Sequence, residues 1–286
     1  MIAPREAPVD RFVTINGLRL HYLDWGNEGA PAVVMLHGLR GYAHTWDSVA
    51  EPLRGSFRIL ALDQRGRGES AWGPWTDYRT EQYVSDLESF VDQLQLIRFV
   101  LIGHSMGGAN SLVYGARHPD RVVAAVIEDM GPGASIGSEG AGRIKAELGN
   151  APDFFASWTE AEAYWRRQRP TASAEGIRSR MAHTLKEAPD GRVVWKYDFL
   201  GIRQARLDDN PARQVDLWPH VDRIACPTLV LRGQHSDFLS RATAEEMARR
   251  NSNIRWAEIE SASHYVHDDN LSAFNEQVGR FLRDLL

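Results

Sequence analysis

One serine of the sequence lies between two glycines at the end of an apolar run. The segment VLIGHSMGG (100–108) places Ser105 two residues after Gly103 and two residues before Gly107. The apolar residues before the serine predict a buried strand, and the small and apolar residues of 106–117 predict a helix after it. A sharp turn between them strains the serine backbone, requires small neighbours and lifts the hydroxyl clear of the sheet. The pattern G-x-S-x-G in this setting predicts a nucleophilic serine.

A nucleophilic serine needs a base, and the base needs an acid that orients it. His264 is the best candidate for the base, because it follows a predicted strand (254–259) and precedes the last predicted helix (269–286). A loop at that point returns to the edge of the sheet where the serine is expected. His267 is the second choice and should lie in the first turns of the helix. His104, beside the serine, is expected to point into the fold as a packed, hydrogen-bonded histidine.

Two aspartates could orient the base. Asp237 follows the predicted strand 227–233, and Asp129 ends the predicted strand 122–129. Either strand end can reach the far side of the histidine. We expect Asp237 to be the acid and keep Asp129 as the alternative. The aspartate that is not used could tie the hinge of an inserted segment or cap a helix.

The negatively charged oxygen of an acyl-transfer intermediate needs two backbone N–H donors. Met106, directly after the serine, is expected to supply one of them. The other is expected from HGLRG (37–41), which follows the strand predicted from AVVMLHG (32–38). Leu39 is the favoured donor, because Gly38 lets the chain turn tightly.

Apolar runs alternate with helical patterns along most of the chain. This alternation predicts an α/β fold with a mostly parallel eight-stranded sheet that helices cover on both faces. The first two strands form a hairpin (11–24) with a type I′ turn at Asn16-Gly17. The other predicted strands are 32–38, 58–66, 98–103, 122–129, 227–233 and 254–259, and the clearest helices are 80–94, 106–117 and 269–286.

One long region interrupts the alternation. Residues 132–221 contain helical patterns but no convincing buried strand, and they begin with the flexible sequence GPGASIGSEGAG. Long insertions at strand ends are where α/β folds build binding sites. We therefore expect residues 132–221 to form a helical cap, or lid, on a core domain of residues 1–131 and 222–286.

Composition excludes some classes of partner. The chain has 286 residues, 43% hydrophobic and 25% charged, and a formal net charge of −5. This charge gives no electrostatic reason to bind nucleic acid or an anionic membrane. Residues 1–12 contain no apolar stretch of the kind that a signal peptide has, and no apolar run approaches the roughly 18 residues of a bilayer span, so we expect neither a signal peptide nor a membrane span. The single cysteine, Cys226, allows no internal disulfide. We expect a cytoplasmic protein without metal or cofactor, and the sequence leaves the oligomeric state open.

Several motifs together resemble the α/β-hydrolase fold family, specifically its lidded serine hydrolases of the esterase and C–C hydrolase types. The resemblance covers nearly all of the chain outside the predicted cap. It implies cofactor-independent hydrolysis, with Asp63 and Arg65 as structural turn residues. Members of this fold that are dehalogenases or epoxide hydrolases use an aspartate nucleophile, whereas this chain has a serine. The motifs are HGLRG (37–41), DQRGRGES (63–70), GHSMGG (103–108), RGQHSD (232–237) and SH (263–264).

Arginines of the predicted cap would indicate a carboxylate substrate if they point inward. YWRRQRP (164–170) contains Arg166, Arg167 and Arg169, and Arg143 lies just after the hinge. A guanidinium group binds a carboxylate through two parallel hydrogen bonds. Otherwise these arginines are solvated charges on helix faces. The candidate substrate-binding residues are His37, Arg143, Arg166, Arg167 and Tyr265.

We expect hydrolysis of a small carboxylic ester or lactone through an acyl-enzyme on Ser105. The first alternative is a C–C bond or amide hydrolase that acts on a small carboxylate. A second resemblance, to hydrolases of (E)-2-(acetamidomethylene)succinate, supports it through the positions of Asp129 and Tyr265. The alternative of another class is a small-molecule receptor built on a hydrolase scaffold.

Overall fold

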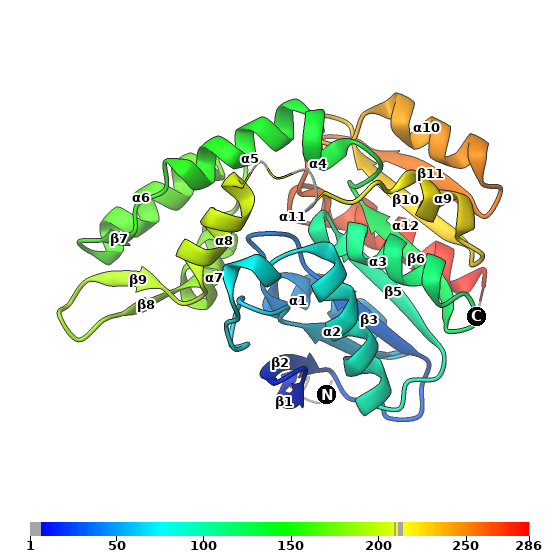
Figure 1. The fold of residues 1–286 in the computed structure, drawn as a ribbon, viewed down its shortest axis with the longest axis horizontal. Helices are drawn as coiled ribbons and strands as arrows, with labels where there is room; N and C mark the ends of the chain where they lie inside the picture. The colour runs from blue at the N-terminus through cyan, green and yellow to red at the C-terminus, as the bar shows by residue number, and fades with distance from the viewer. Residues whose placement is uncertain (1–6, 209, 211–213, 286) are drawn as a thin grey trace, which may run out of the picture.

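The computed structural model describes residues 7–208, 210 and 214–285, and its core is an eight-stranded sheet (Figure 1). The strand order is β1-β2-β4-β3-β5-β6-β10-β11. Pairing is antiparallel between β1, β2 and β4 and parallel between all other neighbours, which confirms the predicted mostly parallel sheet. The strands are β1 (Val9–Ile15), β2 (Leu18–Asp24), β3 (Ala32–Leu36), β4 (Arg58–Leu62), β5 (Phe99–His104), β6 (Val122–Glu128), β10 (Thr228–Gly233) and β11 (Ile254–Ile259).

The first two strands form the predicted hairpin. Ile15 pairs with Leu18 across the turn. The two residues between them, Asn16 and Gly17, have φ angles of 49° and 75°. A type I′ turn requires positive φ at both positions, and Asn-Gly is the pair that adopts it most readily.

Helices cover both faces of the sheet. In β3, Val34 and Leu36 belong to the hydrophobic cluster that contains residues of α2, α3, α9 and α10, whereas Val33 and Met35 belong to a second cluster that contains residues of α1 and α12. This double coverage explains why β3 is buried along its whole length. The helices of these two layers are α1 (Asp47–Leu53), α2 (Thr80–Gln93), α3 (Met106–Arg117), α9 (Trp218–Arg223), α10 (Arg241–Arg250) and α12 (Leu271–Arg283), and the short α11 (Val266–Asp269) precedes α12.

The segment between β6 and β10 lies beside the sheet, over the end where α11 and the start of α3 are found (Figure 1). The sequence had predicted a helical segment here. The structure differs, because the segment also contains a small antiparallel sheet in the order β7-β9-β8. Strands this short carry too little periodicity to be recognised. The elements of this segment are α4 (Ala134–Gly137), α5 (Glu139–Gly149), β7 (Phe154–Phe155), α6 (Trp158–Gln168), α7 (Ala174–Thr184), β8 (Leu185–Glu187), β9 (Val193–Trp195) and α8 (Phe199–Leu207).

An aromatic cluster forms the centre of this segment. Trp195 packs against the rings of Phe155, Trp165 and Phe199, with centroids 4.8–5.9 Å away. The predicted end of the cap at residue 221 falls inside α9, which packs against α3 and therefore belongs to the core layer.

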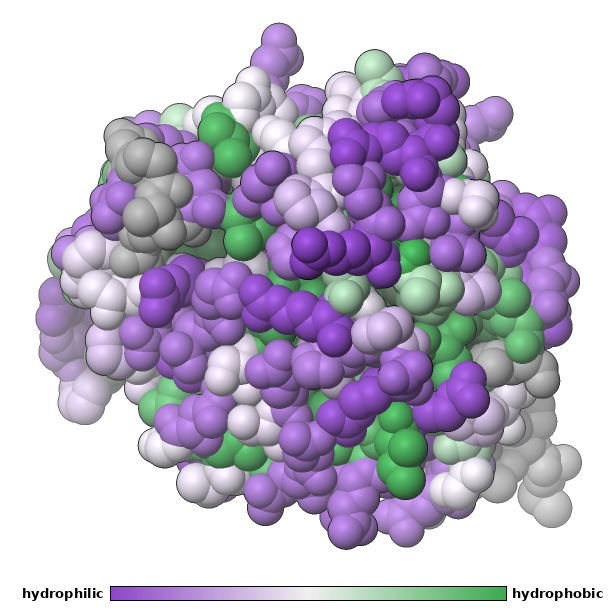
Figure 2. All heavy atoms as spheres, turned by 45° about the vertical axis from the view of Figure 1, so that its right-hand side comes forward, coloured by the Kyte–Doolittle hydropathy of each residue, from purple (hydrophilic) through white to green (hydrophobic). Residues whose placement is uncertain are grey.

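Hydrophobic residues lie in small separate groups among hydrophilic ones on the face shown in Figure 2. Within the described ranges, no helix is both long enough and apolar enough to cross a bilayer.

Candidate active site

Ser105 lies in the turn between β5 and α3. Its backbone has φ 51° and ψ −114°, a strained conformation, and its N–H donates to the carbonyl of Glu128 at 2.9 Å. The flanking glycines leave no room for a side chain. A Cβ at Gly103 would lie 2.4 Å from the carbonyl oxygen of Gly107, and a Cβ at Gly107 would lie 2.0 Å from that of Leu36. The close approach of β3, β5 and α3 therefore fixes the serine at the sheet end.

A chain of two hydrogen bonds joins Ser105, His264 and Asp129. His264 Nε2 lies 3.0 Å from Ser105 Oγ, and His264 Nδ1 lies 2.7 Å from Asp129 Oδ2. When Asp129 is ionised its carboxylate can only accept, so Nδ1 then carries the proton and Nε2 is free to accept the hydroxyl proton. All three residues are buried. The structure thus brings together the predicted nucleophile and the predicted base.

The preference for Asp237 as the partner of His264 is corrected by this geometry. Asp237 accepts hydrogen bonds from Arg143 instead, at 2.7 Å from Nε and 3.0 Å from Nη2. Asp129 follows β6, which is the neighbour of β5 in the sheet, so its carboxylate ends beside the serine. Asp237 lies farther along the loop after β10 and binds Arg143 of helix α5, in the segment between β6 and β10.

Two donors hold the Asp129 carboxylate. The N–H of Gly233 donates to Oδ1 at 3.1 Å, and the hydroxyl of Ser236 donates to Oδ2 at 2.6 Å. Burial raises the pKa of Asp129 to about 7, although these two hydrogen bonds stabilise the ionised form and limit the rise. Sequence reasoning missed Ser236, although it stands in the quoted segment RGQHSD.

His264 is held as a neutral imidazole. Burial lowers its pKa to about 3, and the positive charges of Arg143 and Arg169 act in the same direction. His104 donates from Nε2 to the carbonyl of His264 at 2.9 Å and is itself buried, as predicted. A neutral, fixed imidazole can accept a proton from the serine at neutral pH.

Two residues that line a pocket together with Ser105 have backbone N–H groups without protein partners. Among the described residues, neither Leu39 N–H nor Met106 N–H has a hydrogen-bond acceptor. Met106 is the first residue of α3, where the N–H groups have no intrahelical acceptor and the helix dipole favours negative charge. These are the two donors that the sequence predicted for the oxyanion.

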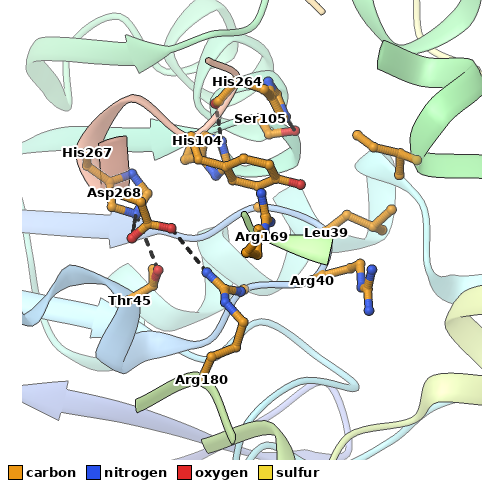
Figure 3. A pocket seen from close by; sticks show the side chains of 14 residues that line it. Leu39, Arg40, Thr45, His104, Ser105, Arg169, Arg180, His264, His267 and Asp268 are labelled. Carbon is orange, nitrogen blue, oxygen red and sulfur yellow. Dashed lines mark hydrogen bonds and ion pairs between the residues drawn. The ribbon is translucent and has the colours of Figure 1, made fainter. Parts of the chain in front are cut away.

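Two pockets meet at Ser105. The first, with a cavity volume of about 20 Å³, lies on the side of His264 and is lined by Arg40, Arg169, Arg180 and Tyr265 (Figure 3). The second, with a cavity volume of about 180 Å³, extends along Met106, Ala109, Met130 and Val215. Leu39 and Ile144 line both pockets. A substrate that reacts at Ser105 can therefore extend in two directions with different chemistry.

Most of the predicted substrate-binding side chains do not face either pocket. His37 is fully buried, donates from Nδ1 to the Gly38 carbonyl at 2.8 Å and accepts from the Gln64 N–H at 3.1 Å, so it has a structural role. Arg166 and Arg167 are exposed on α6, and Arg166 pairs with Glu162. The helical periodicity places them on the outer face.

The two remaining candidate substrate-binding residues are Arg143 and Tyr265. Arg143 is bound to Asp237 and to Glu147 and lines neither pocket. Tyr265 lines the first pocket. Sequence reasoning missed Arg40 and Arg180 there, although Arg40 stands in the quoted segment HGLRG.

Comparison with known protein families identifies the family of this chain. The family model described as alpha/beta hydrolase fold matches residues 31–271, and the chain belongs to this family. The matched region includes the serine, the histidine and both aspartates. The general class of the protein is that of a hydrolase.

Two curated relatives cover most of the chain. The 3-hydroxybutyrate-oligomer hydrolase of Cupriavidus necator is 30% identical over 262 residues, which cover 86% of this chain and 87% of the relative. The 2-(acetamidomethylene)succinate hydrolase of Mesorhizobium japonicum is 26% identical over 260 residues, which cover 91% and 90%. A crystal structure of E-2-(acetamidomethylene)succinate hydrolase superimposes with a TM-score of 0.85 at 24% identity and covers 96% of this chain and 99% of that chain.

Proposed function

We propose that the protein is a serine hydrolase that cleaves a small carboxylic ester or lactone through an acyl-enzyme on Ser105. The observation that carries this proposal is the buried chain of hydrogen bonds from Ser105 through His264 to Asp129. In this proposal His264 accepts the proton from Ser105 Oγ as the oxygen attacks the substrate carbonyl. The Leu39 and Met106 N–H groups stabilise the oxyanion. His264 then protonates the leaving group and activates the water that releases the acid.

A second candidate function is hydrolysis of an amide or a C–C bond in a small carboxylate. The arginines that line the first pocket favour a substrate with an anionic group. Both functions use the same serine and histidine, so the nature of the cleaved bond distinguishes them. The relatives differ in what their names say they hydrolyse, which is why the substrate is kept as a proposal.

The test is hydrolysis of a mixed panel by the purified protein and its Ser105→Ala variant. The panel contains neutral esters, lactones, amides of dicarboxylates and a dienone with a cleavable C–C bond. We expect repeated turnover of an ester or lactone, and a loss of at least about four orders of magnitude in the variant. Labelling with a fluorophosphonate, located by mass spectrometry, should modify Ser105. Its matched control is Ser89→Ala, which changes a serine of α2 and should be labelled like the wild type.

The results separate the candidates. Turnover of only the amide or dienone would replace the ester proposal by the second candidate. Binding of panel members without turnover would favour the small-molecule receptor. Turnover that survives in Ser105→Ala would contradict every mechanism that depends on this serine.

A further inference from the structure

We propose that Arg67 is a positioning residue that holds the two proposed oxyanion donors, Leu39 and Met106, in place. It belongs to the motif DQRGRGES (63–70), in which the sequence indicated roles only for Asp63 and Arg65. This inference rests on the serine hydrolase chemistry proposed above and adds the residue that orients its oxyanion hole.

Arg67 makes the hydrogen bond that holds Leu39. Its Nε donates to the carbonyl oxygen of Leu39 at 3.2 Å. Among the described residues, the N–H and the carbonyl of Leu39 have no other hydrogen bond. Leu39 lies in a turn after β3, where no helix or strand orients its backbone. The direction of the Leu39 N–H therefore depends on this contact and on the preceding peptide group.

The preceding peptide group is held from the other side. His37 Nδ1 and the N–H of Gly41 both donate to the carbonyl of Gly38, at 2.8 and 3.0 Å. A peptide group is planar and trans, so this carbonyl and the Leu39 N–H point in opposite directions. His37 and Gly41 thus fix the plane of the donor, whereas Arg67 fixes the chain that follows it.

The same guanidinium group reaches the second donor residue. Arg67 Nη2 lies 3.8 Å from the sulfur of Met106. The Met106 N–H belongs to the first turn of α3, so the helix orients it. Because the guanidinium group is planar and rigid, its contacts with Leu39 and Met106 set the distance between the loop and the helix. All three residues line the second pocket together with Ser105.

Arg67 is itself held rigidly. It stands between Gly66 and Gly68, whose φ angles of 75° and 51° let the chain turn sharply at this point. Its Nη1 donates to the carbonyl of Arg65 at 3.0 Å and to the hydroxyl of Tyr83. Only 1% of Arg67 is exposed. A side chain with so little freedom fixes the position of the groups that it contacts.

The positive charge of Arg67 has no acidic hydrogen-bond partner in the part of the chain that the structure describes. Its four contacts are neutral groups, namely two carbonyl oxygens, one hydroxyl and one thioether. A buried charge without a counter-ion is costly. Negative charge that develops on the substrate oxygen beside Leu39 and Met106 reduces this cost. The benefit exists only once the oxyanion forms, so it should act on kcat.

The first test is Arg67→Met, which removes the guanidinium group and keeps an unbranched side chain. With phenyl butyrate as the substrate, we expect kcat to fall by at least about tenfold and KM to change by less than about threefold. Arg67→Lys keeps the charge but replaces the planar group by a single ammonium, so its kcat should lie between those of Arg67→Met and the wild type. This second variant also provides the test if Arg67→Met does not fold.

The second test uses two ketones that differ only in whether they form an oxyanion. Ser105 Oγ adds to the carbonyl carbon of 1,1,1-trifluoropentan-2-one, the π electrons move to the carbonyl oxygen, and His264 takes the serine proton. Pentan-2-one binds as a neutral ketone. Arg67→Met should raise the inhibition constant of the trifluoro ketone by at least about tenfold and that of pentan-2-one by less than about threefold. A merely structural role would not separate the two ketones.

The matched control is Arg121→Met. Arg121 also holds a backbone carbonyl, that of Leu96 at 2.7 Å, but it lines neither pocket. This variant should keep kcat and both inhibition constants. A loss of kcat in Arg121→Met equal to that in Arg67→Met would count against a specific role of Arg67.

Three outcomes would overturn the inference while the proposed function stands. The first is Ser105-dependent hydrolysis with an unchanged kcat in Arg67→Met. The second is an equal rise of both inhibition constants, which would assign Arg67 to binding or folding. The third is a wild-type kcat in Arg67→Lys, which would show that the charge alone is sufficient. Absence of Ser105-dependent hydrolysis and of inhibition by the trifluoro ketone in the wild type would instead contradict the proposed function, and the inference with it.

Discussion

His264 Nδ1 and Asp129 Oδ2 lie 2.7 Å apart, although the two residues are 135 positions apart in the sequence. The neighbouring residue Glu128 binds a different histidine, His267, at 2.8 Å. The end of β6 therefore supplies one carboxylate to the proposed triad and another to His267, which lines the first pocket. This arrangement leads to the first prediction.

Asp129→Asn should reduce kcat by about four orders of magnitude, because an amide cannot hold the histidine in the required tautomer. Asp237→Asn is the matched control, since its side chain pairs with Arg143, and it should cost no more than about tenfold. Steady-state kinetics of the two variants on one ester decide the question. A larger loss of kcat in Asp237→Asn than in Asp129→Asn would show that Asp237 is the acid.

Ser236→Ala should lower kcat by about tenfold and leave KM nearly unchanged, because Ser236 positions Asp129 and reaches neither substrate pocket. The comparison is Ser240→Ala, which removes the N-terminal cap of α10. That variant should lose about 1 kcal/mol of stability but keep kcat. A change in KM rather than kcat would show that Ser236 acts on binding.

Gly107→Ala should prevent folding or cost more than about 4 kcal/mol, because the added methyl group would lie 2.0 Å from the carbonyl of Leu36. Gly142→Ala is the matched control on α5. A Cβ there meets nothing within 4 Å, so this variant should be as stable as the wild type or gain up to about 1 kcal/mol. Urea unfolding measures both. If Gly107→Ala unfolds at the same urea concentration as the wild type, the close packing of α3 on β3 is contradicted.

The buried pair of His267 and Glu128 should make stability depend on pH. Burial opposes the charge on His267, but Glu128 and Asp268 together outweigh it and raise the pKa of His267 from 6.5 to about 9. Because the folded-state pKa is above the unfolded value, the stabilisation is complete below pH 6.5 and is lost as the pH rises through about 9. The net pKa shift of His267 corresponds to about 3 kcal/mol of pH-dependent stability.

The measurement is urea unfolding of the wild type and His267→Gln between pH 6 and 10. The difference in the free energy of unfolding should be largest below pH 6.5 and should shrink toward pH 10. His235→Gln, at an exposed position, should show a constant difference. A constant difference for His267→Gln would falsify the proposed charged pair.

The sequence by itself determined the features that depend on local backbone constraints. The two glycines around Ser105 require a turn that only small residues tolerate, and Asn16-Gly17 requires a type I′ hairpin. Continuous apolar strands require a sheet that is covered on both faces. Local residue types are sufficient in these cases, because the strain or burial arises within a few residues.

Tertiary structure decided which distant side chains meet. Asp129 and Asp237 are both aspartates after strands, and only the order β5-β6-β10 of the sheet brings the first of them to His264. Arg166 and Arg169 stand three residues apart, but the first lies on the outer face of α6 and the second turns into the first pocket where the helix ends. Distances across the sheet and the orientation of the cap depend on packing between elements, which residue types and spacing along the chain do not encode locally.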